Sequence, residues 1–170
     1  GYLVRFFGGK HKDLDGEYFN ASSYLGAHDG NGCDTLFHHG IVLKPGLEHF
    51  ADHLFQPMKT YRDDVGIFAE IVLNLADAYE AKIFELVEAG KLGLSSGAAG
   101  HTVKREEDGF LKRWVIAEGS ITPLPCEPYN RVLPLKAINS VKLVDVEDVE
   151  PQATKSGTEE HNSMSNNQNG

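Results

Sequence analysis

The stretch Lys91-Leu-Gly-Leu-Ser-Ser-Gly-Ala-Ala-Gly-His101 combines two adjacent hydroxyls with glycines, and the rest of the chain can be organised around it. Glycine lets the backbone adopt conformations that other residues avoid and brings backbone N–H groups close to a ligand. Ser95 or Ser96 could therefore be a nucleophile with amide donors beside it. A plain glycine-rich turn has the same composition, so this stretch alone leaves both interpretations open.

The segment before this stretch predicts a strand followed by a helix. Residues 65–73 alternate with apolar side chains on one face, and their other face is mostly apolar too, so we expect a strand covered on both sides. Asn74 suits a helix N-cap, with Asp77 at the third helical position and Gly90 at the end. The stripe that this helix would bury consists of Leu75, Tyr79, Ile83, Leu86 and Val87.

The segment after it predicts a β-hairpin. Residues 102–105 and 110–117 read as strands, and the pair Asp108-Gly109 between them is a strong hairpin signal. Pairing these strands would bring Ser95 and the segment around Glu118 to the same end of a sheet. The proline-rich loop that follows Glu118 ends the strand, since proline cannot join a central ladder.

The N-terminal third predicts two further strands. Residues 2–7 form a short run of β-branched and aromatic side chains, and residues 21–34 form a long polar loop. Residues 35–43 read as a strand that carries His38 and His39. Because neighbours in a strand point to opposite faces, only one of these histidines can face a given site.

Composition and charge restrict the classes of partner. The 170 residues suffice for one domain with a core, and residues 150–170 are polar, which predicts a disordered tail. The net charge of −9 argues against a nucleic acid or an acidic membrane as the main partner. No run approaches the roughly 18 apolar residues that a membrane span needs. Because the chain begins at Gly1 inside a predicted strand, we expect residues upstream of it.

The two cysteines, Cys33 and Cys126, lie far apart and form no C-x-x-C pair. A disulfide framework or a structural zinc site is therefore not expected, and a reducing cytosolic compartment fits better. His49 and His53 have the spacing of a shared metal site on a helix, but the second position of an H-E-x-x-H motif is Phe50 here. A second metal hypothesis, with Cys33, Asp34 and His38 as ligands, has no recognised spacing.

Nucleophilic catalysis by serine needs a base to take its proton and a third group to orient that base. The chain has all three types of side chain at the predicted ends of elements. The candidates are Ser95 or Ser96, His38 or His39, and Glu70 or Glu118. Backbone amides at Ser96 and Gly97 could stabilise an oxyanion. No phosphate-binding glycine motif is present, and the α/β-hydrolase elbow lacks its β/α context.

Five motifs, taken together in their order and spacing, resemble the prohead protease family of tailed phages, over residues 2 to 131. They are Asp13-Leu-Asp-Gly-Glu-Tyr-Phe, Leu36-Phe-His-His-Gly40, the helix Ala78-Tyr-Glu-Ala-Lys-Ile-Phe-Glu-Leu86, Gly93-Leu-Ser-Ser-Gly-Ala98 and Arg113-Trp-Val-Ile-Ala-Glu-Gly-Ser-Ile-Thr-Pro123. The family is similar in fold to the herpesvirus maturation proteases. The resemblance implies an α+β fold over residues 1–149, with a β-barrel-like, mainly antiparallel sheet surrounded by helices.

The resemblance also implies a catalytic triad. The family serine lies directly before a variable residue and a glycine, which selects Ser95, and the family histidine selects His39. The family acid lies in the strand before a serine- and proline-containing turn, which selects Glu118 and leaves Glu70 as second choice. Cys126 stands where the family has a small residue, which puts the packing of that loop in doubt.

The function implied by the resemblance is that of a serine endopeptidase of bacteriophage virion maturation. It would act in the host cytoplasm, inside the immature capsid, on the major capsid protein and the scaffold, and then often on itself. No metal and no cofactor is implied, and assembly with further copies of the chain stays open. Two alternatives remain: a non-catalytic capsid-assembly or scaffold protein that keeps the protease fold, and a small metal-dependent hydrolase that uses the histidines.

Overall fold

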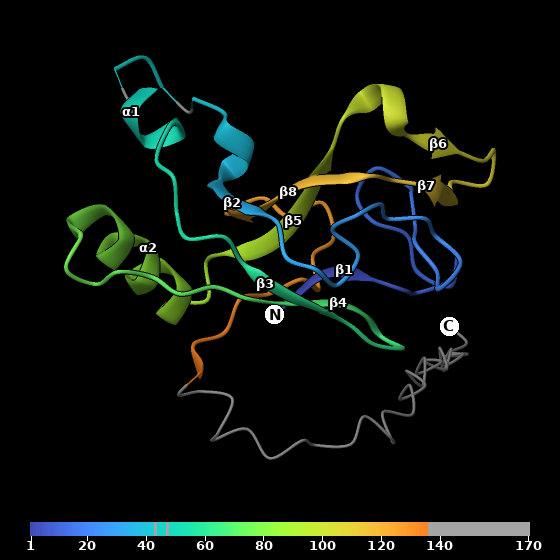
Figure 1. Ribbon diagram of the computed structural model, residues 1–170, viewed down its shortest axis with the longest axis horizontal. Coiled ribbons are helices and arrows are strands. Elements are labelled where there is room, and N and C mark those ends of the chain that lie inside the picture. The colour runs from blue at the N-terminus through green and yellow to red at the C-terminus, as the bar shows by residue number, and fades with distance from the viewer. Residues whose placement is uncertain (43, 47, 136–170) are drawn as a thin grey trace, which may run out of the picture. The chain divides into compact units, whose positions relative to one another are not determined.

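The computed structural model describes residues 1–42, 44–46 and 48–135, which all lie within one compact unit, Gly1–Ser140 (Figure 1). The side chains of His49 and Phe50 are outside this description. The predicted domain boundary at residue 149 and the tail 150–170 also lie outside the described residues.

One antiparallel sheet contains the strands β1 (Tyr2–Arg5), β4 (Gly66–Glu70) and β3 (Lys59–Arg62), in the order β1-β4-β3. The predicted strands at 2–7 and 65–73 are thus confirmed, although both are shorter. The expectation that the second is covered on both sides is wrong. Its inner face is buried at Ile67 and Ala69, but Glu70 and Val72 on the other face are exposed.

A second sheet contains β2 (Asp34–Phe37), β8 (Ile116–Thr122) and β5 (Gly93–Ala98), in the order β2-β8-β5. β2 runs parallel to β8, and β5 runs antiparallel to it. The glycine-rich stretch, expected to be a loop, is therefore itself a strand, because β8 supplies a full ladder of backbone partners. Gly97, near the end of β5, pairs with Glu118. Ser95 and the segment around Glu118 therefore lie close together, as the sequence predicted.

The predicted strand at 35–43 ends at Phe37 instead of continuing through the histidines. His38–Gly40 form a 3₁₀ turn, which we name the histidine turn. The backbone φ angles of His38, His39 and Gly40 are 47°, 59° and 65°. Left-handed conformations of this kind cannot continue a strand, which is why the strand stops.

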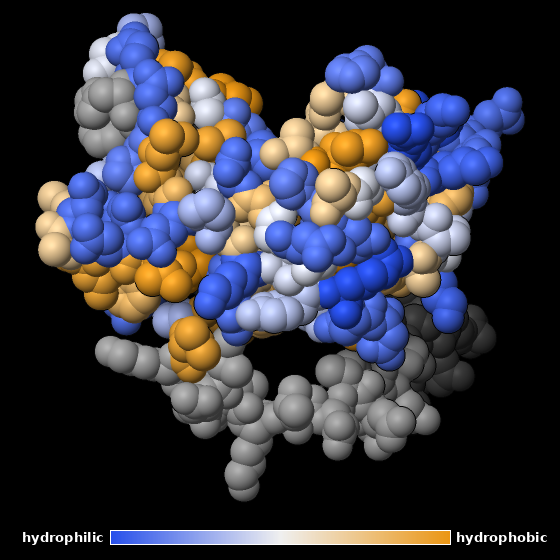
Figure 2. Space-filling model, viewed as in Figure 1, coloured by the Kyte–Doolittle hydropathy of each residue, from blue (hydrophilic) through white to orange (hydrophobic). Residues whose placement is uncertain are grey.

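The predicted hairpin is confirmed by the antiparallel pair β6 (Lys104–Arg105) and β7 (Leu111–Arg113). The expected strand at 110–117 is divided between β7 and β8, and the expectation that it ends in the loop after Glu118 is wrong, because β8 continues to Thr122. Gly109 has a φ of 92° in the turn and donates its N–H to the Glu106 carbonyl at 3.0 Å. Figure 2 shows polar and charged side chains over this hairpin, whereas hydrophobic side chains gather on the side of α1 (Glu48–Ala51) and α2 (Ala78–Glu88).

Helix α2 begins three residues later than expected. Asp77, not Asn74, is the N-cap, and its carboxylate accepts from the N–H groups of Tyr79 and Glu80 at 2.8 and 3.0 Å. Asn74 instead accepts from Ala76 N in a preceding turn. The predicted end is confirmed, since the last helical residue is Glu88 and Gly90 follows with a φ of 66°. Of the predicted stripe, Leu75 is 55 % exposed and does not join the core.

The core forms where the two sheets and α2 contribute their apolar faces. Side chains that are at most 4 % exposed and belong to one cluster are Leu3, Val4, Leu25, Met58, Ile67, Ala69, Ile83, Val87, Leu92, Leu94, Ile116 and Ile121. Burial of this apolar surface is the main force that holds the sheets together. It also fixes which face of β5 and β8 is left for polar groups.

The architecture is mixed α+β and consists mostly of sheet. Within the described residues the strands form three separate sheets and do not close into a barrel, so the barrel-like part of the expected fold is not confirmed. The broad α+β class is confirmed. No helix in the described part of the chain is long and apolar enough to cross a membrane.

Replacing Asp77 by Ala should lower the midpoint of urea unfolding, because two N–H groups at the start of α2 would lose their acceptor. Asn74→Ala is the matched control, since the cap that the sequence suggested at Asn74 is absent from the structure. Circular dichroism would follow both transitions. A larger loss of stability in Asn74→Ala than in Asp77→Ala would contradict the assigned helix start.

Candidate functional site

The side chains at alternate positions of β8 form a polar face. Because side chains two residues apart in a strand point to the same side, Glu118, Ser120 and Thr122 share one face of the sheet. Gly119 and Ile121 face the core instead. All three polar side chains form hydrogen bonds to the two histidines of the histidine turn or to one another, so this face is the natural place to look for a site.

Glu118 holds the ring of His39. Its Oε1 lies 2.6 Å from His39 Nδ1, and the two side chains are 16 % and 28 % exposed, respectively. A carboxylate on Nδ1 favours the tautomer with the proton on that nitrogen and leaves Nε2 free to accept one. His39 Nε2 has no hydrogen-bond partner among the described residues, so the ring is poised to act as a base.

Two hydroxyls of β8 fix the histidine turn. Ser120 Oγ accepts from His39 N at 2.9 Å and donates to Glu118 Oε2 at 2.7 Å, so Ser120 links both members of the pair. Thr122 Oγ1 lies 2.8 Å from His38 Nδ1. Non-glycine residues with positive φ are strained, and such strain concentrates at functional sites. The two hydroxyls offset this strain and aim the two rings.

The register of β5 distinguishes the two serines. Ser95 lies directly opposite Ser120, so its side chain is on the face that carries His39 and Glu118. Ser96 points to the other face, where its Oγ accepts from Trp114 Nε1 at 3.1 Å. Ser95 is 9 % exposed, and its hydroxyl has no hydrogen-bond partner in the described part of the chain. The geometry therefore selects Ser95 as the serine of the site.

Backbone directions in β5 show which amide is available as an oxyanion donor. Leu94 N donates to the Asn130 carbonyl at 2.7 Å, on the edge of β5 away from β8. Because alternate N–H groups in a strand point the same way, Ser96 N–H points to this edge too and Gly97 N–H points to β8. Of the two amides proposed from the sequence, Ser96 N–H is the available one.

Gly97 leaves the space that Glu118 occupies. A Cβ at position 97 would lie 2.0 Å from Glu118 Oε1, which is closer than two non-bonded heavy atoms can approach. Any larger residue would displace the carboxylate from His39. The glycine content of the stretch thus serves close approach of a side chain at Gly97, where no positive φ is involved.

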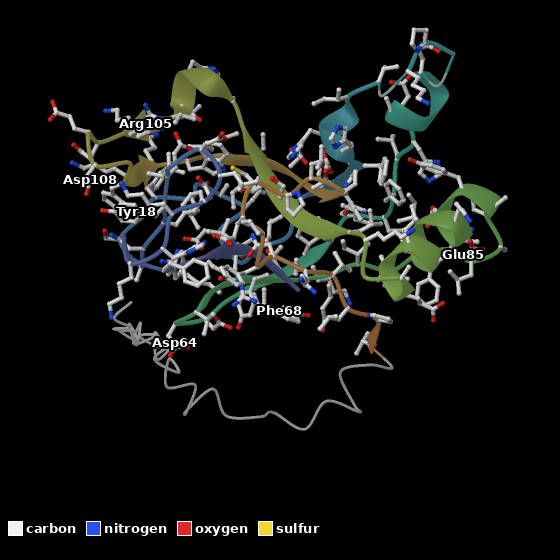
Figure 3. The ribbon with its side chains drawn as sticks, turned by 180° about the vertical axis from the view of Figure 1, so that it is seen from behind. Tyr18, Asp64, Phe68, Glu85, Arg105 and Asp108 are labelled. Atoms are coloured by element: carbon white, nitrogen blue, oxygen red, sulfur yellow. The ribbon has the colours of Figure 1, made fainter. Side chains whose placement is uncertain are left out.

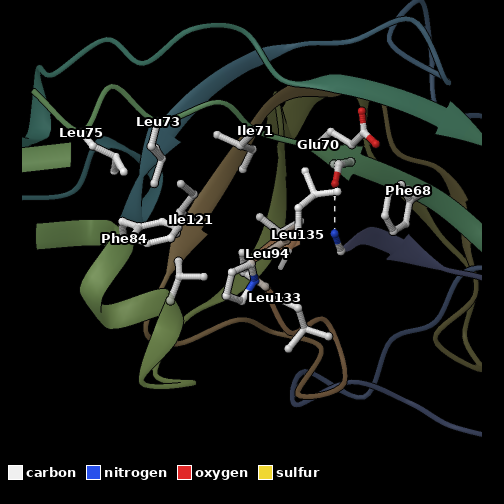
Figure 4. Close-up of a pocket in the computed structure, with 15 residues that line it drawn as sticks. Phe68, Glu70, Ile71, Leu73, Leu75, Phe84, Leu94, Ile121, Leu133 and Leu135 are labelled. Atoms are coloured by element: carbon white, nitrogen blue, oxygen red, sulfur yellow. Dashed lines mark hydrogen bonds between the residues drawn. The ribbon is translucent and has the colours of Figure 1, made fainter. Parts of the chain in front are cut away.

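A cavity of about 340 Å³, which we name the serine cleft, lies along β5 at these groups. Its lining includes His39, Ser95, Ser96, Gly97, Trp114 and Asn130. A second cavity, of about 330 Å³, lies between β4, α2 and residues 132–135 (Figure 4). Its walls are apolar except at Glu70 and Gly1, and it offers no nucleophile, so it does not compete with the serine cleft as a reaction site.

The other sequence candidates lie elsewhere. Glu70 belongs to the first sheet, is exposed and accepts from Tyr61 Oη at 3.4 Å, so Glu118 and not Glu70 orients His39. His53 Nε2 lies 3.0 Å from Glu80 Oε1. Burial raises the pKa of the Cys33 thiol to about 12. No group of three potential metal ligands occurs among the described residues.

Comparison of the chain with protein-family models, with curated proteins and with solved structures finds no match in any of the three. The resemblance to the prohead proteases therefore stays a hypothesis that depends on the motifs themselves. The geometry of the site is a separate argument and is independent of it.

Sequence reasoning missed the roles of Ser120, Thr122 and Trp114. Glu118, Ser120 and Thr122 alternate with smaller or apolar residues, which is the period-2 signal of a polar strand face. That pattern could have identified the three as one set. The contact between Trp114 and Ser96 follows from tertiary packing and leaves no local trace.

Ser120→Ala should destabilise the fold by about 1–3 kcal/mol, because His39 N and Glu118 would lose the partner that the fully buried Ser120 hydroxyl provides. Thr35→Val is the matched control. Thr35 is 1 % exposed and lies opposite Gly119 on the neighbouring strand, and its hydroxyl has no hydrogen-bond partner among the described residues. Urea unfolding should show little change for this variant. Equal losses in both variants would mean that Ser120 merely fills space.

The stability should also depend on pH through His38. Burial lowers the pKa of His38 below its ordinary value of 6.5, and the charge of His39 lowers it further. Unfolded chains therefore bind the proton first as the pH falls, so His38 contributes stability above pH 6.5 that is lost as the pH drops through the lower folded value.

His38→Gln removes this dependence. The free energy of unfolding of the wild type minus that of the variant should be larger at about pH 7.5 than at about pH 5. Urea titrations at both pH values measure it. Parallel pH profiles for the two proteins would exclude His38 as a contributor.

Proposed function

We propose that the chain is a serine endopeptidase of the phage prohead maturation type, with Ser95 as nucleophile, His39 as base and Glu118 as the orienting acid. The observation that carries the proposal is the short His39–Glu118 pair on the same sheet face as Ser95. This order of acid, base and hydroxyl is the arrangement that activates serine on unrelated folds.

In this mechanism His39 Nε2 takes the proton of Ser95 Oγ as the oxygen attacks the carbonyl carbon of the peptide bond. The negative oxygen that forms lies against the edge of β5, where Ser96 N–H can donate to it. The imidazolium then gives its proton to the leaving amine. Water hydrolyses the acyl-enzyme by the same steps, and Glu118 keeps the ring in its productive tautomer throughout.

Ser95 and His39 form no hydrogen bond with each other in the described residues. Catalytic hydrogen bonds are frequently long in the absence of substrate and tighten when it binds. The proposal requires Ser95 Oγ and His39 Nε2 to come within hydrogen-bond distance when substrate binds, and both residues line the serine cleft. Substrate in the cleft would supply the contacts for that adjustment.

The role in capsid maturation is supported by the motif resemblance alone. Under it, the substrates are the scaffold and the major capsid protein inside the prohead, followed by the protease itself. The second candidate function is a non-catalytic assembly or scaffold protein with the same fold. The unusual turn at His38 and His39 favours the enzyme, because a scaffold has no need for strained backbone beside a hydroxyl.

Ser95→Ala should abolish cleavage of a co-expressed major capsid protein, a loss of at least about 10³-fold, because the nucleophile is removed. Ser96→Ala should retain most of the cleavage, since its backbone amide remains and only the bond from Trp114 is lost. Mass spectrometry of the capsid protein provides the readout. An active Ser95→Ala together with an inactive Ser96→Ala would reverse the assignment of the two serines.

A fluorophosphonate probe separates the enzyme from the scaffold alternative. Labelling at Ser95 in the wild type, and none in Ser95→Ala or His39→Ala, is expected of an activated serine. Equal labelling of the wild type and His39→Ala would show that the histidine does not activate the hydroxyl.

A further inference from the structure

The serine cleft continues past the proposed triad into a markedly acidic wall. Four of its lining residues are carboxylates: Asp13, Asp15, Glu17 and Glu127. One lining residue, Arg5, carries a guanidinium, which is stacked over the ring of Tyr2 at 4.5 Å from the centroid. A peptide that reaches Ser95 through this cleft would therefore meet a negative surface.

Two of the carboxylates have cationic partners and two do not. Arg105 Nη1 lies 2.9 Å from Glu17 Oε1, and His11 Nε2 lies 3.1 Å from Glu127 Oε2. In Figure 3 Arg105 lies on the hairpin close to Asp108 and Tyr18, at the same end of the molecule. Asp13 and Asp15 form no ion pair within the described residues, so their charges are not balanced locally.

The thiol of Cys126 is in direct contact with one of the two unpaired carboxylates. Its Sγ donates to Asp15 Oδ2 at 3.2 Å. Burial, the hydrogen bond to Asp15 and the charge of Asp13 together raise its pKa to about 12. A protonated, neutral thiol therefore lines the cleft in contact with Asp15.

Asn130 is a second, independent sign of a missing partner. It is 3 % exposed and lines the cleft, its Nδ2 donates to the Leu3 carbonyl at 3.0 Å, and its Oδ1 accepts from no described residue. Buried amide oxygens normally accept a hydrogen bond. Arg5 Nε, which also lines the cleft, is a buried donor without a partner among the described residues. Asn130 Oδ1 and the carboxylates of Asp13 and Asp15 are acceptors, and the group that would satisfy these three is a multiple donor with positive charge.

We propose that this wall binds a lysine or arginine side chain of the peptide substrate, close to the bond that Ser95 cleaves. The inference rests on the proposed function, because it takes the serine cleft as the peptide site. Ammonium and guanidinium groups carry several donors and a charge of the required sign. Charge-assisted bonds to Asp13 and Asp15 would make the contact selective for basic over neutral side chains.

The test uses full-length Ser95→Ala protein and five-residue peptides of alanine and glycine with lysine, norleucine or glutamate at the centre. Binding is measured by NMR titration. We expect the lysine peptide to bind about tenfold more tightly than the norleucine peptide, and the glutamate peptide to bind most weakly. The preference should shrink as salt is added.

The double substitution Asp13→Asn and Asp15→Asn should remove most of the preference for lysine. Asparagine keeps an acceptor oxygen, so the turn bonds from the N–H groups of Asp15 and Glu17 to position 13 persist. The matched control, Glu85→Gln with Glu88→Gln, removes the same charge from the exposed face of α2, where Figure 3 labels Glu85. This control should keep the full preference.

Equal binding of the lysine and norleucine peptides, or an unchanged preference after substitution of Asp13 and Asp15, overturns the inference. The proposed function is tested separately by cleavage with the wild type. Cleavage without a preference for basic residues would contradict the binding of a basic side chain and support the proposed peptidase function. Selective binding of the lysine peptide with no cleavage by the wild type would support the binding site and contradict the peptidase function.

Discussion

The pairing of β5 with β8 is the constraint on which the candidate site depends. In this register Ser95 faces Ser120 and Gly97 faces Glu118, so the hydroxyl, the linking serine and the acid share one face. A slip of one residue would turn Ser95 toward the core and bring Ser96 to His39. The register is held by Leu94 and Ile121, which are opposite each other and both 1 % exposed. The hydrophobic core thereby fixes the position of the polar groups.

The histidine turn has an unfavourable backbone conformation that positions the rings of His38 and His39. Two consecutive non-glycine residues with positive φ are each unfavourable by about 1–3 kcal/mol. Hydrogen bonds of the turn with the hydroxyls of Ser120 and Thr122, together with the pair between Glu118 and His39, oppose this tendency. Every one of these partners comes from β8. The turn and the strand therefore form one unit, and a change in either should be felt in the other.

Much of the arrangement could be predicted from the sequence, and the failures have physical causes. The alternation of residues 65–73 and the Asp-Gly turn at 108–109 are local signals, and both gave correct elements. The glycine-rich stretch became a strand because of β8, a partner distant in sequence. Asp77 displaced Asn74 as the cap because either side chain can begin a helix, and tertiary packing decides between them. The strand at 35 ended early because positive φ at His38 depends on hydroxyls more than 80 residues away.

Trp114 gives the molecule an optical property of its own. It is the single tryptophan of the chain, and its indole N–H is bonded to the hydroxyl next to Ser95. Indole emission depends on the polarity around the ring and on the hydrogen bond of its nitrogen. The intrinsic fluorescence of the protein therefore originates at the edge of β5, within the lining of the serine cleft. Events at this edge are visible in the emission spectrum without any added label.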